Sequence, residues 1–465
     1  MPQEELRPGS ISVDGFTLFN DKGQDFDLKT FITQISIFED IFSNNLYGVA
    51  TITDNNNLVG SIPIIGREIL NVNVHVPGFE NSRIDRAFYV YSVQNRTATS
   101  GDRQQTYDLH FMSLEGIADN VTYLSKKYTG PTDKIAEDIF NEHLRMPKVW
   151  KKEYPFPSGM STANSFLQPE WVKALPQENL TQLSVAGSRP FKSKVTWVVP
   201  MWTPFKAINW LANRSIDGST DGPNVLFWES SQGFYLASMD TIFENQKDAQ
   251  QRKMFFYGLD QAAIEKISSS KGMANKLAKG YEKVEEVELP AVNDMVKSQD
   301  FGHYASNMHV LDIVKKEYKE YVFDYASNFD TFKHLDGARP AFNANVVRNI
   351  YSYRSFRPKH TKLFNDWEDP KYEKWVTQRT SLMHDLSNLR VIITVPGFCN
   401  IEAGEAVNFY YPKMGEKGAE NELKDLVDPY LSGSYVVVAA RHMITESKYR
   451  MKLELVKESL ASSLV

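Results

Sequence analysis

The stretch that decides the fold class is Asn71-Val72-Asn73-Val74-His75-Val76, which ends at Pro77-Gly78. Successive side chains of an extended chain point to opposite faces, so the three valines share one face and the three polar residues share the other. A run of this kind closed by Pro and Gly is typical of a half-buried β-strand. The stretch therefore predicts a strand with an apolar face toward a core and a polar face away from it.

Two further runs extend this pattern through the first region of the chain. The run Tyr107-Asp108-Leu109-His110-Phe111 also alternates, with two polar residues opposite three apolar ones. The run 88–93 is β-branched and aromatic, and the polar stretch 95–105 separates the two runs. Together they predict a long hairpin and an antiparallel β domain over residues 1–118.

A different periodicity marks residues 119–270. Apolar residues at helical spacing follow the start signal Pro131-Thr132-Asp133, and Thr203-Pro204 predicts the beginning of a second helix. The segments 195–199 and 225–236 have the composition of a strand and of a hairpin. The middle of the chain is therefore predicted to be an α/β region.

The C-terminal part of the chain repeats features of the first domain. Three pairs of segments match in the same order, namely 40–48 with 294–302, 67–78 with 404–412, and 88–111 with 435–455. The matches predict two similar β domains. The alternative interpretation is that any two antiparallel domains share such patterns.

Length and composition exclude several classes of protein. The 465 residues predict two to four domains, and the net charge of −6 argues against a dedicated nucleic-acid binder. No apolar run approaches the ~18 residues of a membrane span, so no membrane insertion is expected. Because Cys399 is the single cysteine and the N-terminus does not resemble a signal peptide, a reducing compartment is expected.

The residue patterns of common catalytic and metal sites do not occur in the sequence. The stretch 60–67 lacks the spacing of a phosphate-binding loop, and His303 and His309 are six residues apart rather than the four of a helical zinc site. Cys399 lies among apolar residues and is predicted to be packed rather than reactive. We therefore predict no catalytic residue, no metal site and no cofactor.

Four stretches in this order carry a resemblance to a known family. They are the segment 202–212, the hairpin 226–235, the pair 301–306 and 318–321, and the ending 433–455. In this order they resemble the baseplate central hub protein of contractile-tailed bacteriophages, a family related to the upper part of type VI secretion spikes. The resemblance covers residues 30–460.

The resemblance implies a structural protein of the α+β class, mainly β, with two tail-tube-like antiparallel β-barrels joined by an α/β region. It implies a homotrimer whose pseudo-sixfold ring adapts the sixfold tail tube to the threefold spike and lets DNA pass without specific binding. The implied partners are the tail tube protein, a separate spike protein and inner baseplate proteins, and the implied location is the virion baseplate, assembled in the host cytoplasm. The expected domains are residues 1–118 (first barrel), 119–270 (α/β region), 271–326 with 386–465 (second barrel) and 327–385 (insertion).

Two functions of other classes stay open at this point. One is a virion-associated hydrolase whose catalytic pair is hidden among the acidic residues. The other is a receptor-binding or carbohydrate-binding tail module, which the aromatic content would permit.

The polar faces of the predicted barrel strands are candidates for a channel wall, and an ordinary solvated outer face is the alternative. Residues of mixed charge suit a conduit that must not hold a passing polyanion. The candidate channel-lining residues are Asn71, Asn73, His75, Asp108, His110, Arg450, Lys452 and Glu454.

The predicted insertion contains a basic and aromatic cluster. No acidic residue occurs between Asp336 and Asp366, although the net charge of the chain is −6. Such a cluster can dock on an acidic protein surface, which is the favoured interpretation, or bind nucleic acid, or form a solvated face. The candidate partner-docking residues are Arg354, Arg357, Lys359 and Lys362.

Overall fold

The structure is a computed structural model that covers most of the 465-residue chain. It describes residues 7–20, 24–61, 64, 66, 68–98, 104–148, 176–248, 251–259, 264, 280–292, 294–300, 302–312, 316–338, 356–358, 372–386, 389–414, 426–446 and 448–460.

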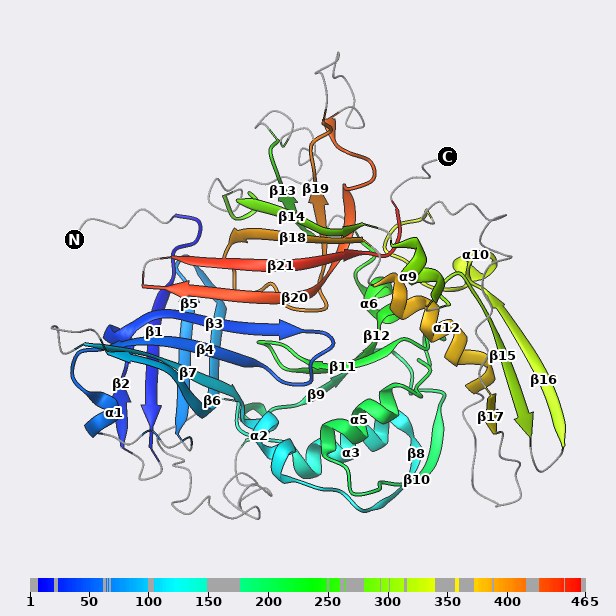
Figure 1. Cartoon of the computed structure of the whole chain (residues 1–465), viewed down its shortest axis with the longest axis horizontal. Coiled ribbons are helices and arrows are strands. Elements are labelled where there is room, and N and C mark those ends of the chain that lie inside the picture. The colour runs from blue at the N-terminus through cyan, green and yellow to red at the C-terminus, as the bar shows by residue number, and fades with distance from the viewer. Residues whose placement is uncertain are drawn as a thin grey trace.

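One large sheet dominates the fold (Figure 1). It has 13 strands in the order β14-β18-β21-β20-β3-β4-β7-β6-β5-β1-β2, with β19 also beside β20 and β13 beside β19. All of its pairs are antiparallel except β13 with β19. Its strands are β1 (Ser12–Phe19), β2 (Asp25–Asp27), β3 (Ile32–Asp40), β4 (Tyr47–Asp54), β5 (Ile69–Val76), β6 (Phe79–Ala98), β7 (Gln105–Ser113), β13 (Lys253–Phe256), β14 (Glu286–Val292), β18 (Leu389–Pro396), β19 (Ala406–Tyr410), β20 (Gly433–Thr445) and β21 (Tyr449–Lys457).

Alternation buries one face of these strands, as the sequence pattern predicts. The three valines of β5 are fully buried, and so are Leu109 on β7 and Leu453 on β21. They belong to one apolar cluster that takes side chains from both the N-terminal and the C-terminal strands. The prediction of a mainly β, antiparallel fold is confirmed.

The two parts of this sheet have the same strand order. In the N-terminal part the strands follow one another along the chain as β3, β4, β5, β6 and β7, and they lie in the sheet in the order β3-β4-β7-β6-β5. In the C-terminal part β14, β18, β19, β20, β21 pairs as β14-β18-β21-β20-β19. Each strand therefore has a counterpart at the same place in chain order and in the sheet. The described strands form no closed barrel, so the two-barrel arrangement stays a prediction.

One of the three predicted segment matches is wrong in part. Asp40 ends β3 and Asp294 follows the equivalent strand β14, but the chain after Gly302 enters a separate sheet. The strand that pairs as β4 does is β18, which begins only at Leu389. The match failed after Gly302 because the segment between β14 and β18 forms strands of its own, which pair in a separate sheet.

The two parts join edge to edge through β20 and β3. Seven antiparallel partners run from Ala439 with Asp40 to Thr445 with Gln34. Because β20 also pairs with β19 and β21, this long strand belongs to the C-terminal part and continues the sheet into the N-terminal part. Figure 1 shows β3 and β20 side by side near the middle of the sheet.

The middle unit covers one end of the sheet (Figure 1). Its own core gathers residues such as Phe140, Ile208 and Phe234. Helix α5 begins at Pro204 as predicted, but its first turn is capped by Asp119, whose Oδ1 accepts from the Phe205 N–H at 2.6 Å. Its elements are α2 (Leu114–Val121), β8 (Lys127–Pro131), α3 (Thr132–His143), β9 (Leu183–Val185), β10 (Lys194–Val198), α5 (Pro204–Ala212), β11 (Val225–Glu229), β12 (Phe234–Ser238) and α6 (Met239–Asn245).

A third unit interrupts the C-terminal part between β14 and β18. Its sheet has the order β16-β15-β17, and Met308 and Val310 of β15 pack against Trp375. Its elements are α9 (Met295–Asp300), β15 (Ala305–Asp312), β16 (Glu317–Asp324), α10 (Tyr325–Asn328), β17 (Phe356–Pro358) and α12 (Tyr372–Asp385). The short helix α1 (Leu58–Ser61) lies near the other end of the molecule (Figure 1). None of the helices that the structure describes is long and apolar enough to cross a membrane.

Candidate functional site

The eight predicted channel-lining residues all lie on strands of the large sheet, and their side chains alternate with buried core residues. Seven of them are half-buried and Arg450 is exposed. Three are on β5, two on β7 and three on β21. The structure therefore puts them on the side of the sheet opposite the core, as the alternation predicts.

The β7 and β21 residues share one continuous sheet face. The register joins Arg450 to Met443 on β20, Met443 to Ser36 on β3, and the row continues through β4 to His110. Directly opposite residues of antiparallel strands point to the same face. This polar face, defined by the outward residues of β18, β21, β20, β3, β4 and β7, crosses the joint between the two parts.

The β5 residues lie where the middle unit covers the sheet. Ile69 on β5 and its neighbour Ala87 on β6 contribute to the apolar core of the middle unit. Asn71, which pairs with Ala87, has a buried Oδ1. Farther along the strand His75 Nδ1 lies 2.7 Å from Asp14 Oδ2, and Asn73 Oδ1 accepts from Arg83 at 3.0 Å. The outward residues of β5 are therefore partly enclosed by neighbouring side chains.

Charges on the polar face are paired with charges on or beside β18 and β14. Arg450 Nε lies 2.9 Å from Glu285, Lys452 Nζ 2.7 Å from Glu288, and Arg390 2.7 Å from Glu454. On β7 Asp108 accepts hydrogen bonds from Thr51 and Asn95, each at 2.7 Å. The face thus carries many charges with little local excess of either sign.

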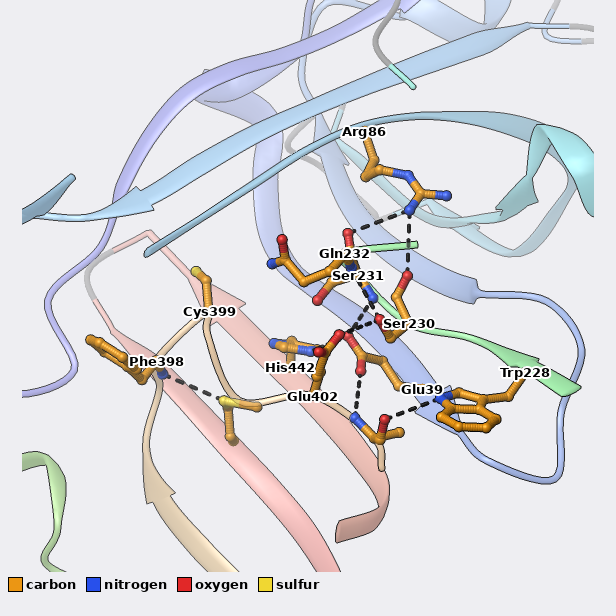
Figure 2. A network of polar contacts seen from close by, with 12 residues as sticks. Glu39, Arg86, Trp228, Ser230, Ser231, Gln232, Phe398, Cys399, Glu402 and His442 are labelled. Carbon is orange, nitrogen blue, oxygen red and sulfur yellow. Dashed lines mark hydrogen bonds and ion pairs between the residues drawn. The ribbon is translucent and has the colours of Figure 1, made fainter. Parts of the chain in front are cut away.

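A buried polar network lies behind this face, at the joint between the two parts (Figure 2). Glu39 on β3 accepts from the Ser231 N–H at 2.9 Å and the Ala403 N–H at 3.0 Å, and lies 3.1 Å from His442 Nε2. His442 Nδ1 lies 2.7 Å from the Tyr449 hydroxyl. Burial opposes ionisation of Glu39, but its hydrogen bonds and its electrostatic interaction with His442 hold its pKa below the ordinary value.

The turn between β11 and β12 inserts into this network. Ser230 Oγ donates to Glu402, and the Tyr235 hydroxyl donates to the same carboxyl at 3.1 Å. Burial, reinforced by the nearby Glu39 carboxylate, raises the pKa of Glu402 to about 7. Trp228 Nε1 donates to the Ala403 carbonyl at 3.1 Å. These contacts fasten the middle unit to the joint of the large sheet.

Arg86 on β6 completes the attachment (Figure 2). Its guanidinium donates to the Ser230 carbonyl at 3.3 Å and forms a buried ion pair with Glu229. Burial and the neighbouring Glu115 raise the pKa of Glu229 to about 7, although Arg86 opposes this shift. Arg86 therefore ties β6 to the turn between β11 and β12 through buried polar contacts.

The residues of this network were not predicted from the sequence as a site. One feature of the sequence does indicate the network. Glu39 lies on the same face of β3 as the buried Ile35 and Ile37, where the alternating pattern predicts an apolar residue. Cys399, predicted to be packed, is fully buried, and burial raises the pKa of its thiol to about 11. That prediction is confirmed.

The predicted partner-docking residues are not placed by the structure. Arg354, Lys359 and Lys362 lie outside the described residues. Only the backbone of Arg357 is described, in β17 opposite Val310. Their role stays a prediction.

Comparison of the fold with solved structures finds tail proteins. A tail protein from Neisseria meningitidis and the tail protein of prophage MuSo2 from Shewanella oneidensis are each 9% identical with a TM-score of 0.48. The comparison covers 97% of this chain and 96% of the first protein, and 96% of this chain and 98% of the second.

A third structure is a component of the Escherichia coli type VI secretion system, which is described as similar to the T4 tail proteins gp27 and gp5. It is 6% identical to this chain with a TM-score of 0.38, and the comparison covers 96% of this chain and 76% of that protein. No protein-family model and no curated protein matches the sequence. The names of these structures are those of tail proteins and of a type VI secretion component.

Proposed function

We propose that the chain is a structural subunit of a phage tail baseplate hub. The observation that carries the proposal is the equal strand order of the two parts and their union into one sheet. Three copies of a chain with two equivalent parts supply six similar units around one axis. Such a homotrimer would adapt a sixfold tail tube to a threefold spike.

In this proposal the two parts are the two tube-like barrels, completed on assembly. The first barrel is residues 1–118, the α/β region is 119–270, and the second barrel lies within 271–326 and 386–465, without β15 and β16, which pair in a sheet of their own. The segment 327–385 would face inner baseplate proteins, with Arg354, Arg357, Lys359 and Lys362 as docking residues. The tail tube and spike proteins would bind the two ends of the ring.

The polar face is proposed to line the bore through which DNA passes. The cross-strand pairing of Arg450, Lys452 and Glu454 supports this role. A cation that is already paired gains less from a phosphate, so a wall of this kind would not retain the polyanion. The proposal includes no catalytic step.

The test is native mass measurement of the purified protein together with electron images of single particles. We expect a trimer and a ring with a central hole, with the polar face of β7 and β21 on its inner wall. A monomer that cleaves peptidoglycan would instead support the hydrolase, and a monomer that binds cell-surface glycans would support the receptor-binding module. A ring that carries the polar face on its outer circumference would contradict the channel assignment.

A further inference from the structure

The outer side of the middle unit is a two-stranded ribbon of residues 123–131 and 194–203. Strands β8 and β10 form its regular part, with Lys127 opposite Val198 and Lys194 opposite Pro131. The pairing continues beyond β10, since the Leu124 N–H donates to the Trp202 carbonyl at 2.8 Å. In Figure 1 the ribbon lies at the edge of the molecule, away from the large sheet. We call it the basic ribbon.

Charge distinguishes the basic ribbon from the rest of the chain. Residues 120–132 and 179–216 contain no Asp or Glu, whereas the whole chain has a net charge of −6. Lys126 on the ribbon pairs with Glu142, which lies outside these segments, at 2.7 Å. Among the residues that the structure describes, no acidic side chain pairs with Lys127 or Lys194, and both are exposed. The ribbon therefore offers cationic groups for an external partner.

Large apolar side chains are exposed along the same ribbon. The exposed fractions are 62% for Tyr123, 57% for Val198 and 64% for Met201. Met201 also has a φ of 54°, in the left-handed region that a residue with a Cβ rarely adopts. Such local strain is most often retained where function requires it. Here the turn holds an apolar side chain in solvent at one end of the ribbon, three residues beyond Val198, whose strand partner is Lys127.

A ladder of rings supports the end of the ribbon. The Trp197 and Trp210 rings stack with centroids 4.1 Å apart, and Trp202 lies 5.7 Å from Trp197. The Arg214 guanidinium lies 4.0 Å from the Trp210 centroid, and Lys206 Nζ lies 4.9 Å from that of Trp202. The Trp197 and Trp210 rings cover each other, Arg214 lies over Trp210, and Lys206 lies over Trp202. The ladder is thus rigid before any partner binds.

We propose that the basic ribbon docks an acidic protein surface that has an apolar pocket for Met201. Trp, Tyr, Met and Arg are the residues enriched in the centres of protein interfaces, and a rigid anchor loses little entropy on binding. Single-stranded nucleic acid would need free ring faces for base stacking, and the ladder leaves few. A membrane surface would need a broad apolar stripe, whereas three apolar residues here are interspersed with lysines.

The experiment measures binding of four probes to the full-length protein. The probes are a Trp-free synthetic peptide that contains Glu, Leu and Phe, a poly-Glu peptide of equal charge, single-stranded and duplex DNA, and phosphatidylglycerol vesicles. Tryptophan fluorescence and titration calorimetry report binding. We expect the mixed peptide to bind most tightly and its affinity to fall as salt rises. Stronger binding of DNA or vesicles, or no binding of the mixed peptide, would overturn the proposal.

Two variants test the surface itself. Lys127→Glu with Lys194→Glu should weaken binding of the mixed peptide by about tenfold or more, because attraction becomes repulsion. Lys316→Glu with Lys413→Glu is the matched control, since it makes the same charge change at exposed sites elsewhere and should bind as the wild type does. If both double variants lose the same affinity for the mixed peptide, binding depends only on the net charge of the protein. That result would contradict the proposal that the basic ribbon is the docking site.

Met201→Gly separates the apolar contact from the charges. Glycine adopts a positive φ without strain, so this variant should be at least as stable as the wild type. We expect weaker binding of the mixed peptide and unchanged binding of poly-Glu. An unchanged affinity for the mixed peptide would rule out the pocket for Met201.

Discussion

At the residue scale the half-buried carboxyl of Glu402 is a group whose ionisation depends on the fold. It accepts from the Ser230 and Tyr235 hydroxyls, and within the described residues it has no ion pair. Its ordinary pKa of 4.5 is raised to about 7. Because the folded protein holds this proton more tightly than the unfolded chain, the carboxyl stabilises the fold most at low pH.

We predict that Glu402→Gln removes this part of the pH dependence. The free energy of unfolding of the wild type should fall as pH rises from 4.5 to about 7, relative to the variant, and the difference should level off above pH 7. The size of the change should be about 3 kcal/mol, because each unit of the pKa shift from 4.5 to about 7 corresponds to about 1.4 kcal/mol. Urea unfolding at a series of pH values measures it.

Glu288→Gln is the control for the pH experiment. Its side chain is 55% exposed in an ion pair with Lys452, so the substitution should leave the profile near that of the wild type. If Glu402→Gln and the wild type lose stability in parallel between these pH values, Glu402 is ionised in the folded protein and the prediction fails.

At the element scale the packing of β4 between β3 and β7 depends on Gly48. A Cβ at this position would lie 2.3 Å from the Phe111 ring and 2.7 Å from the Ser36 carbonyl oxygen. The ring belongs to β7 and the carbonyl to β3, so neither can move without disturbing a strand.

We predict that Gly48→Ala destabilises the protein by about 1–3 kcal/mol through overpacking. Gly337→Ala is the matched control, because nothing lies within 4 Å of its Cβ and the residue is exposed. Its effect should stay within about 0.5 kcal/mol. The midpoints of urea unfolding compare the two, and equal midpoints would show that the strands accommodate the methyl group.

At the scale of the whole molecule the two parts of the sheet share one apolar core. Leu109 and Phe111 of β7 belong to the same cluster as Leu453 and Leu455 of β21. The β20–β3 pairing and the Glu39–His442 contact cross the same joint. The two parts should therefore open together rather than as separate domains.

We predict that Leu453→Ala lowers amide protection in β7 as much as in β21. The cavity should cost about 2–5 kcal/mol, and hydrogen exchange measured on both strands should report the same loss. Ile139→Ala, in the core of the middle unit, is the control and should affect α3 more than β7. Protection of β7 that does not change in Leu453→Ala would mean that the two parts open independently.

The local sequence pattern by itself determined several strands of this protein, their buried faces and the beginning of one helix. Alternation in 71–76 and 107–111 predicted strands and their buried faces, and Thr203-Pro204 predicted the beginning of α5. These features depend on neighbours a few residues away, so a short window of sequence contains their cause. The equal order of strands in the two parts was likewise indicated by two of the three segment matches.

Only the tertiary structure decided which strand edges meet and which polar groups are enclosed. The Glu39–His442 contact joins residues 403 positions apart, and the cap of α5 comes from Asp119 on another helix. The segment after Gly302 formed its own sheet, although its sequence suggested a continuation of the repeat. Such pairings depend on how whole faces exclude water and satisfy buried polar groups together. No local window of sequence contains that information.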